Sequence, residues 1–173
     1  GTYQWNSEIS CEVDTEIFEE NIRKSEQKEL SEDEQAYWLE QAIFSYKGDF
    51  LPKNSVELWI VPLQTYYEGL FEKSVRRYYY IAQKKEDFVS MEKICYKAVQ
   101  IDQFSEDFYI MLIECFCRLK KYKEALEAYE KIADFLYDQL GVSPSERLLE
   151  LYKEIMGELN YVEQNLMLID QDL

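Results

Sequence analysis

The stretch that decides the fold of this chain is residues 88–140, FVSMEKICYKAVQIDQFSEDFYIMLIECFCRLKKYKEALEAYEKIADFLYDQL. Phe88 and Tyr122 lie 34 residues apart, and each opens an apolar series of the same shape. The first series continues with Met91, Cys95 and Ala98, the second with Ala125, Tyr129 and Ile132, and a third at helical spacing between them holds Phe108, Leu112, Phe116 and Leu119. The stretch therefore predicts helices that recur in antiparallel pairs.

This repeat predicts an all-α fold. A period of about 34 residues, with two helices in each unit, is typical of tetratricopeptide-type repeats. We expect a tetratricopeptide-like, right-handed solenoid of helical hairpins with about seven helices. The beginning of the chain has a different pattern, because Tyr3 and Trp5, followed by Ile9, Cys11 and Val13, alternate with polar residues. That alternation predicts a short N-terminal strand or hairpin.

Capping signals place the first helices. Asp14 is expected to cap a first helix, and Ser31 with Glu34 forms a capping box at the start of a second. Gly48 stands where a helix C-terminus needs a left-handed residue. A short helical piece bearing Trp59 is then expected, with a new helix starting near Pro62 because proline is tolerated in a first turn.

Further signals follow the central repeats. Gly141 is expected to end the long helix before it, and Ser143 to cap the next one with Pro144 at its first position. Gly157 is expected to interrupt that helix, and residues 158–173 can form either a further helix or a tail.

Composition and charge exclude several classes. The formal net charge is −16, from 35 acidic and 19 basic residues, so the chain should repel nucleic acid, whose binding rests on lysine and arginine. No apolar run approaches the length of about 18 residues that a membrane helix needs, so we expect a soluble, cytoplasmic protein with no membrane partner. The chain has ample apolar content to fold, since 47% of its residues are hydrophobic.

We expect no enzyme, no cofactor and no metal. The chain has no histidine, no glycine-rich phosphate loop and no nucleophile elbow, and its frequent carboxylates are typical of solvated helix faces. Its cysteines therefore lack the usual base partner of a nucleophile. The four cysteines, Cys11, Cys95, Cys115 and Cys117, are interpreted as free thiols in a reducing compartment.

Three blocks of sequence carry a family resemblance. They are residues 13–19 (VDTEIFE), residues 46–52 (YKGDFLP) with Trp59 soon after, and residues 139–145 (QLGVSPS). In this order, over roughly residues 13 to 156, the chain resembles the bacterial transcriptional activator domain of the antibiotic regulatory protein family of activators. The residues that match the family motifs, expected to be structural, are Asp14, Phe18, Gly48, Asp49, Phe50, Leu51, Pro52, Trp59, Gly141 and Pro144.

The resemblance implies a domain organisation. Residues 1–13 would be the remnant of the terminal hairpin of an upstream winged-helix DNA-binding domain, residues 14–157 the activator domain, and residues 158–173 a C-terminal extension. The family usually has arginines shortly after the tryptophan, whereas Gln64 and Tyr66 occupy those places here. A partner surface that relies on those arginines is therefore not transferred to this chain.

The expected site is a groove for another protein. In a solenoid of helix pairs the first helix of each pair lines the concave face. The repeat register puts Arg76, Tyr80, Gln83 and Lys84 of one helix, and Ile110, Glu114, Cys117 and Arg118 of the next, on that face. Aromatic and arginine side chains are frequent in binding hot spots, although the same positions can simply be solvated.

Two functions remain open. The first is the regulatory and dimerisation domain of a bacterial transcriptional activator, which takes part in signal transduction and contacts DNA only through the upstream domain. Its partner would be a second copy or another regulatory protein. The alternative is a free-standing tetratricopeptide adaptor that binds a partner peptide in its concave groove.

Overall fold

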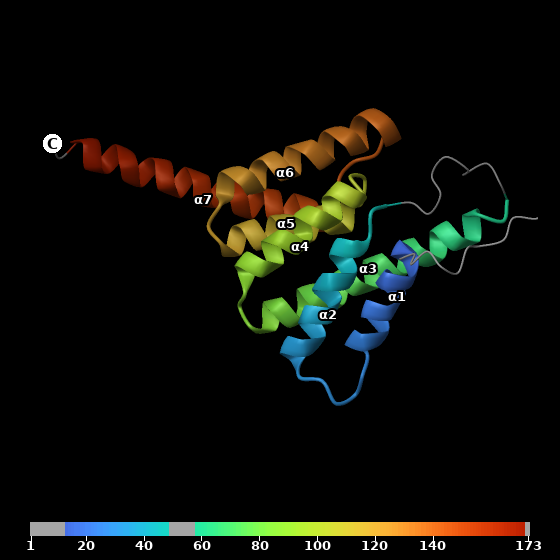
Figure 1. The fold of residues 1–173 in the computed structure, drawn as a ribbon. Helices are drawn as coiled ribbons and strands as arrows, with labels where there is room; N and C mark the ends of the chain where they lie inside the picture. Colours follow the sequence, from blue (N-terminus) through green and yellow to red (C-terminus); the bar gives the residue numbers. More distant parts are fainter. Residues whose placement is uncertain (1–12, 49–57, 172–173) are drawn as a thin grey trace, which may run out of the picture. The chain divides into compact units, whose positions relative to one another are not determined.

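The computed structural model describes residues 13–48 and 58–171, and within them the predicted all-α fold is confirmed. The expected N-terminal strand or hairpin lies outside these residues. The chain divides into an N-terminal unit, residues 1–74, and a C-terminal unit, residues 75–173. The described elements, drawn in Figure 1, are α1 (Asp14–Ser25), α2 (Glu32–Ser45), α3 (Val61–Lys84), α4 (Phe88–Ile101), α5 (Glu106–Arg118), α6 (Tyr122–Phe135), the π-helix η2 (Leu136–Leu140) and α7 (Glu146–Gln171).

Helices α1 and α2 begin close to where their caps predict. Asp14 is the first residue of α1 rather than its cap: Val13 takes the cap position, and the Asp14 carboxylate accepts from the Thr15 N–H at 2.9 Å. The predicted capping box of α2 is confirmed, since the Ser31 hydroxyl accepts from the Glu34 N–H while the Glu34 carboxylate accepts from the Ser31 N–H. Both hydrogen bonds of this capping box join residues three positions apart, so the sequence alone predicts it.

Aromatic rings in contact fill the core of the N-terminal unit. Phe18 of α1 is 1% exposed and lies 5.0 Å, between ring centroids, from Tyr46. Tyr46 in turn stacks on Phe71 of α3 at 4.6 Å. Aromatic side chains bury large apolar areas, so these contacts hold the first half of α3 against the α1–α2 hairpin.

The end of α2 differs in detail from the expectation. The helix ends at Ser45 with Tyr46 in an extended conformation, so Gly48 lies beyond the C-cap, although its φ of +119° does require glycine. The next described residues form a turn that contains Trp59, and Pro62 then lies in the first turn of α3, as predicted.

The 34-residue repeat is visible in the C-terminal unit. Phe88 and Tyr122 are the first residues of α4 and α6. The turns before them are also equivalent: Glu86 and Lys120, 34 residues apart, have left-handed φ values of 55° and 58°. In each turn the next N–H donates to a carbonyl five residues back, from Asp87 to Ala82 at 3.0 Å and from Lys121 to Phe116 at 2.9 Å. Both turns are Schellman motifs with a non-glycine residue at the left-handed position.

The link between α6 and α7 departs from the repeat. Helix α6 runs into the π-helix, which Gly141 ends with a left-handed φ of 64°, as expected of that glycine. Helix α7 starts at Glu146 instead of Pro144, because the Ser145 hydroxyl, not that of Ser143, accepts from the first turn at the Leu148 N–H. The Ser145 N–H donates to the Glu106 carboxylate of α5 at 2.8 Å, which fixes this start.

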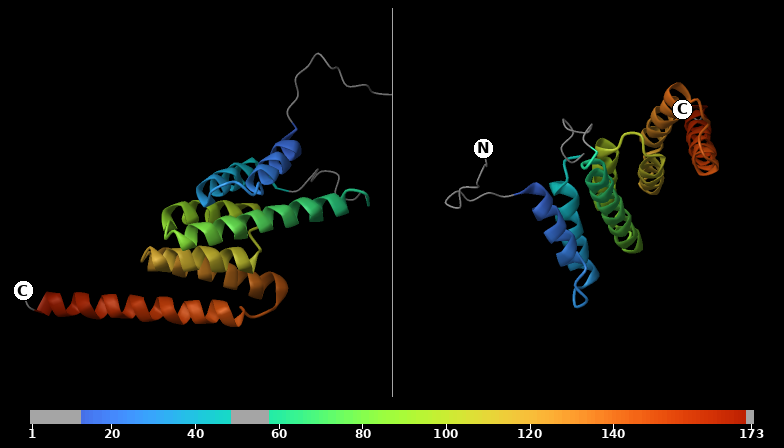
Figure 2. Two further views of the ribbon diagram at one scale, coloured as in Figure 1. Left: turned by 90° about the horizontal axis from the view of Figure 1, so that it is seen from below. Right: turned by 90° about the vertical axis from the view of Figure 1, so that its right-hand side faces the viewer.

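Helix α7 is long and continuous. It passes through Gly157, which therefore does not interrupt it, and it continues to Gln171. Two views show its C-terminal half running past the ends of the other helices of the same unit (Figures 1 and 2). Its first half packs inward, with Leu148, Leu151 and Ile155 at most 1% exposed. No helix among the described residues combines the length and the apolar character that crossing a membrane requires.

Candidate functional site

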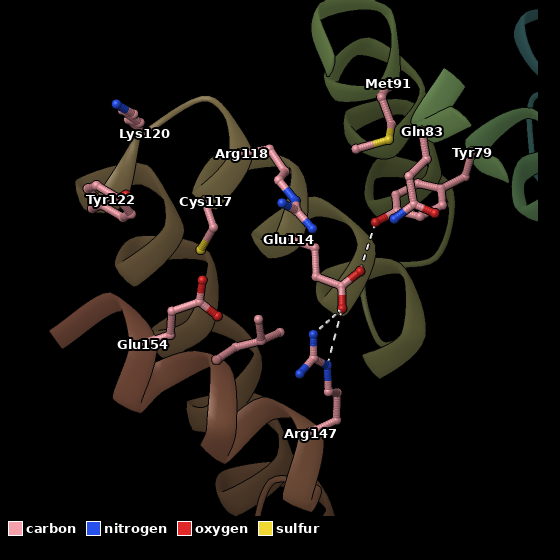
Figure 3. A pocket seen from close by; sticks show the side chains of 11 residues that line it. Tyr79, Gln83, Met91, Glu114, Cys117, Arg118, Lys120, Tyr122, Arg147 and Glu154 are labelled. Atoms are coloured by element: carbon pink, nitrogen blue, oxygen red, sulfur yellow. Dashed lines mark hydrogen bonds and ion pairs between the residues drawn. The ribbon is translucent and has the colours of Figure 1, made fainter. Parts of the chain in front are cut away.

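The C-terminal unit contains a groove of about 470 Å³ on the face formed by α3, α5 and α7 (Figure 3). A volume of this size is in the range that holds a ligand or a few side chains of a partner. Each of the three helices contributes to its wall, and α4 and α6 contribute one residue each. The lining residues are Tyr79, Gln83, Met91, Glu114, Cys117, Arg118, Lys120, Tyr122, Arg147, Leu151 and Glu154.

Glu114 is the centre of a hydrogen-bond network in this groove. The Tyr79 hydroxyl of α3 donates to Glu114 Oε2 at 2.8 Å. Arg147 of α7 donates to Glu114 Oε1 through Nε at 3.1 Å and through Nη2 at 2.6 Å, and also to Glu150 at 3.1 Å. One carboxylate of α5 therefore connects three helices, and Figure 3 shows the bonds of Glu114 to Tyr79 and Arg147 as dashed lines.

The network changes the acidity of its members. Burial raises the pKa of Tyr79 far above its ordinary value, and the bond to the Glu114 carboxylate raises it further, so the hydroxyl keeps its proton. The pKa of Arg147 is also raised, first by its hydrogen bond to Glu114 and then by that to Glu150. Both groups hold the protonation state that these bonds need throughout the physiological range.

Two further cations lie in the groove. Arg118 is the last residue of α5, and Lys120 occupies the left-handed position of the turn that follows. Both side chains are exposed, and within residues 13–48 and 58–171 neither forms a hydrogen bond or an ion pair. They are therefore available to an anionic group from another molecule.

The cysteine of the groove is not prepared for nucleophilic chemistry. Burial raises the pKa of Cys117 to about 11, and the nearby Glu154 and Glu114 carboxylates add to this effect. Burial likewise raises the pKa of Cys115 to about 12, and its thiol donates to the Phe88 carbonyl oxygen at 3.1 Å. Nucleophilic cysteines need the thiolate, so at neutral pH these thiols act as packing groups.

Four of the eight residues expected in the groove line it, namely Gln83, Glu114, Cys117 and Arg118. The other four, Arg76, Tyr80, Lys84 and Ile110, are not among the lining residues. Arg76 pairs with Asp107 of α5 at 2.5 Å, Tyr80 is 65% exposed, Lys84 is exposed and Ile110 is half-buried.

The family-motif residues have local roles where they are described. Phe18 is buried, Gly48 and Gly141 have positive φ, and Trp59 is 59% exposed. Pro144 is half-buried just before α7. Asp49, Phe50, Leu51 and Pro52 lie outside the described residues.

Sequence reasoning missed Tyr79, Met91, Lys120, Tyr122, Arg147, Leu151 and Glu154 as lining residues. A signal existed for Tyr79, since at least one of three successive tyrosines on a helix had to lie in the core. No signal for Arg147 was available, because the repeat register does not extend through residues 136–145.

Comparisons with known proteins give one family and one fold. Residues 13–156 match the family model described as "Bacterial transcriptional activator domain". No curated protein sequence is significantly similar to the chain.

A solved structure of Mycobacterium tuberculosis EmbR, in complex with a low-affinity phosphopeptide, is similar to the chain with a TM-score of 0.59 and 14% sequence identity. The match covers 91% of this chain and 43% of EmbR, so the chain spans less than half of that protein. At this identity the likeness shows a shared fold.

Proposed function

The chain belongs to the bacterial transcriptional activator domain family, and on that premise we propose that it is the protein-interaction half of a DNA-binding transcriptional regulator. The observation that carries this proposal is the groove on α3, α5 and α7, whose wall is fixed by the bonds of Glu114 to Tyr79 and Arg147. A preorganised wall reduces the entropy that binding must overcome. The proposed role is binding a protein, without catalysis.

The partner is a second copy of the chain or another regulatory protein. The negative net charge of the chain supports a protein partner over DNA, since a net charge of −16 opposes contact with phosphates. The EmbR structure contains a phosphopeptide, which supports a regulatory protein as the class of partner. In this proposal a winged-helix domain of the parent protein contacts the DNA in the cytoplasm.

Two experiments test the proposal. The gene of the parent protein should encode a winged-helix domain before these residues, and its absence there would remove the link to DNA. Light scattering over a wide concentration range should give a mass that rises above the 20.9 kDa of one chain if the domain dimerises. A mass that stays at one chain would exclude dimerisation.

The groove also supports a second candidate function, a tetratricopeptide adaptor. This adaptor would be a monomer at every concentration and would bind a partner's extended tail or helix in the groove. The light-scattering series separates the two candidates, because the first predicts a dimer and the second predicts a monomer. Both candidates use the groove, so its presence does not separate them.

A further inference from the structure

We propose that the C-terminal half of α7 binds a basic amphipathic helix of a partner protein, which packs along the apolar stripe of α7 beyond the end of α6. This surface is separate from the groove, because no lining residue of the groove follows Glu154 in the chain. Binding there would be a second contact of the chain, beyond the proposed function.

One apolar stripe runs along the whole of α7. Its positions recur at alternating spacings of four and three residues, which keeps them on one side of a helix. They are Leu148, Tyr152, Ile155, Leu159, Val162, Leu166 and Ile169. This spacing is typical of a helix that packs lengthwise against another helix.

The first part of the stripe packs within the chain. Leu148 and Ile155 are each 0% exposed, and the ring of Tyr152 stacks on Tyr129 of α6 with 4.7 Å between the ring centroids. At the other end of α6 the Tyr122 hydroxyl donates to the Glu158 carboxylate of α7. Because Tyr122 is the first residue of α6, this helix covers the stripe only as far as about Glu158.

The second part of the stripe lies beyond α6. Figures 1 and 2 show this half of α7 running past the other helices of its unit. Leu159 is half-buried and Val162 is 45% exposed, and the same spacing continues in the sequence at Leu166 and Ile169. A helical segment of about a dozen residues is marginal in water without tertiary packing. A further helix that continues the place of α6 would supply that packing.

The charge of this half selects the partner. From Glu154 to Gln171 the helix has no basic residue and four acidic ones, Glu154, Glu158, Glu163 and Asp170. In paired helices the residues beside the apolar stripe determine which partner is accepted, through attraction or repulsion of their charges. Two copies of this half would bring like charges together. A helix with lysine or arginine beside its own stripe is therefore the favoured occupant.

The test uses the full chain and three dansyl-labelled peptides of three heptads each. The basic peptide has leucines at the stripe positions and lysines beside them. The acidic peptide has the same leucines with glutamates beside them. The serine peptide keeps the lysines but has serine in place of each leucine. Fluorescence anisotropy measures the affinity of each peptide for the chain.

Two double variants test the apolar stripe. The stripe variant is Val162→Ser with Leu166→Ser. The matched control is Val89→Ser with Leu140→Ser, which removes the same two kinds of side chain from exposed positions of α4 and the π-helix, 70% and 59% exposed. Far-ultraviolet circular dichroism and the urea midpoint verify folding, and the single variant Val162→Ser gives a second measurement if the double variant unfolds.

Two further double variants test the charge. The charge variant is Glu163→Lys with Asp170→Lys, and its control is Glu130→Lys with Asp134→Lys at exposed positions of α6. Each replaces two acidic by two basic residues, so both change the net charge from −16 to −12.

The basic peptide should bind the natural chain more tightly than the acidic peptide, and the serine peptide should show no saturable binding. The stripe variant should lose about tenfold or more in affinity for the basic peptide, whereas its control should lose much less. The charge variant should reverse the preference between the basic and acidic peptides, and its control should not. Added salt should reduce the preference because it screens exposed charges.

Equal binding of the basic and acidic peptides would overturn the inference, as would no binding of either. Equal losses in a variant and its control would also overturn it. A mass above one chain in light scattering that the stripe variant returns to one chain would identify a second copy as the occupant and overturn it as well. The proposed function is judged separately by the parent gene, which does not depend on these peptides.

Discussion

The Tyr79 hydroxyl offers the sharpest test of the network that shapes the groove. Tyr79→Phe removes one oxygen atom, which donates to Glu114 at 2.8 Å from a ring that is 8% exposed. Hydrogen bonds to charged groups contribute about 1.5–3 kcal/mol. Glu114 keeps its bonds to Arg147 and its side chain is 25% exposed, so we expect the lower end. The free energy of unfolding should fall by about 1.5 kcal/mol.

Two other tyrosines provide matched controls for the same chemical change. Tyr80, the next residue, is 65% exposed, so Tyr80→Phe should change the free energy of unfolding by less than about 0.5 kcal/mol. Tyr109 is 2% exposed, and its hydroxyl has no hydrogen-bond partner among the described residues. Tyr109→Phe removes this unsatisfied group and should stabilise the protein by up to about 1 kcal/mol.

Urea unfolding, followed by circular dichroism, measures all three variants. The midpoints should shift while the m-values remain equal, because the surface exposed on unfolding hardly changes. The reasoning is refuted if Tyr79→Phe and Tyr80→Phe have the same effect. It is also refuted if Tyr109→Phe is the most destabilising of the three, since its hydroxyl would then have a partner.

Three further predictions concern the left-handed turn, a capping box and a thiol. Lys120→Gly should raise the free energy of unfolding by about 0.5–1 kcal/mol because glycine adopts a φ of 58° without strain. Lys131→Gly, at an exposed position in the interior of α6, should instead lower it by about 1 kcal/mol. Glu34→Gln should destabilise the protein in urea at neutral pH. The Ser31 hydroxyl and N–H lower the pKa of Glu34, so this stabilisation exists above the ordinary pKa of 4.5 and is lost as the pH falls through the lowered value. An equal difference in the free energy of unfolding between the natural chain and the variant at neutral and at acidic pH would contradict this. The rate of Cys117 alkylation should rise with pH up to about 11, the raised pKa of this thiol, instead of levelling near the ordinary value of 9. Glu154→Gln should lower the pKa of Cys117 without restoring the ordinary value, because burial is the larger cause of the shift.

Much of the fold is readable from the sequence because its signals are local. The equivalence of Phe88 and Tyr122 predicted the starts of α4 and α6. Ser31 and Glu34 predicted a capping box that closes within four residues. Such signals depend on neighbours in the chain, so no tertiary contact can override them easily.

Other features depend on contacts between distant residues. The start of α7 at Glu146 follows from the bond of Ser145 to Glu106, which lies 39 residues earlier, so the Ser143–Pro144 pattern predicted the wrong start. Gly157 lies inside α7 although glycine weakens helices by about 1 kcal/mol relative to alanine. Nothing in its own neighbours shows that the helix continues.

The candidate site was predictable from the sequence only in part. Of the positions that the 34-residue register placed in the groove, three of the four on α5 line it, Glu114, Cys117 and Arg118, but of the four on α3 only Gln83 does. Arg147 does not follow, since the π-helix and the link to α7 add residues between α6 and α7. Sequence reasoning therefore found the α5 side of the groove and missed the arginine that fixes Glu114 from the other side.

The central claim is that the groove on α3, α5 and α7 binds a partner protein. Amide chemical-shift mapping of the isotope-labelled chain, titrated with an excess of the unlabelled chain as the proposed partner, tests it most directly. The account predicts that the largest shifts occur around Gln83, Cys117, Arg118, Lys120 and Arg147, which line the groove. Saturable shifts confined to α1 and α2, or to the α4 and α6 residues outside the groove, would contradict it.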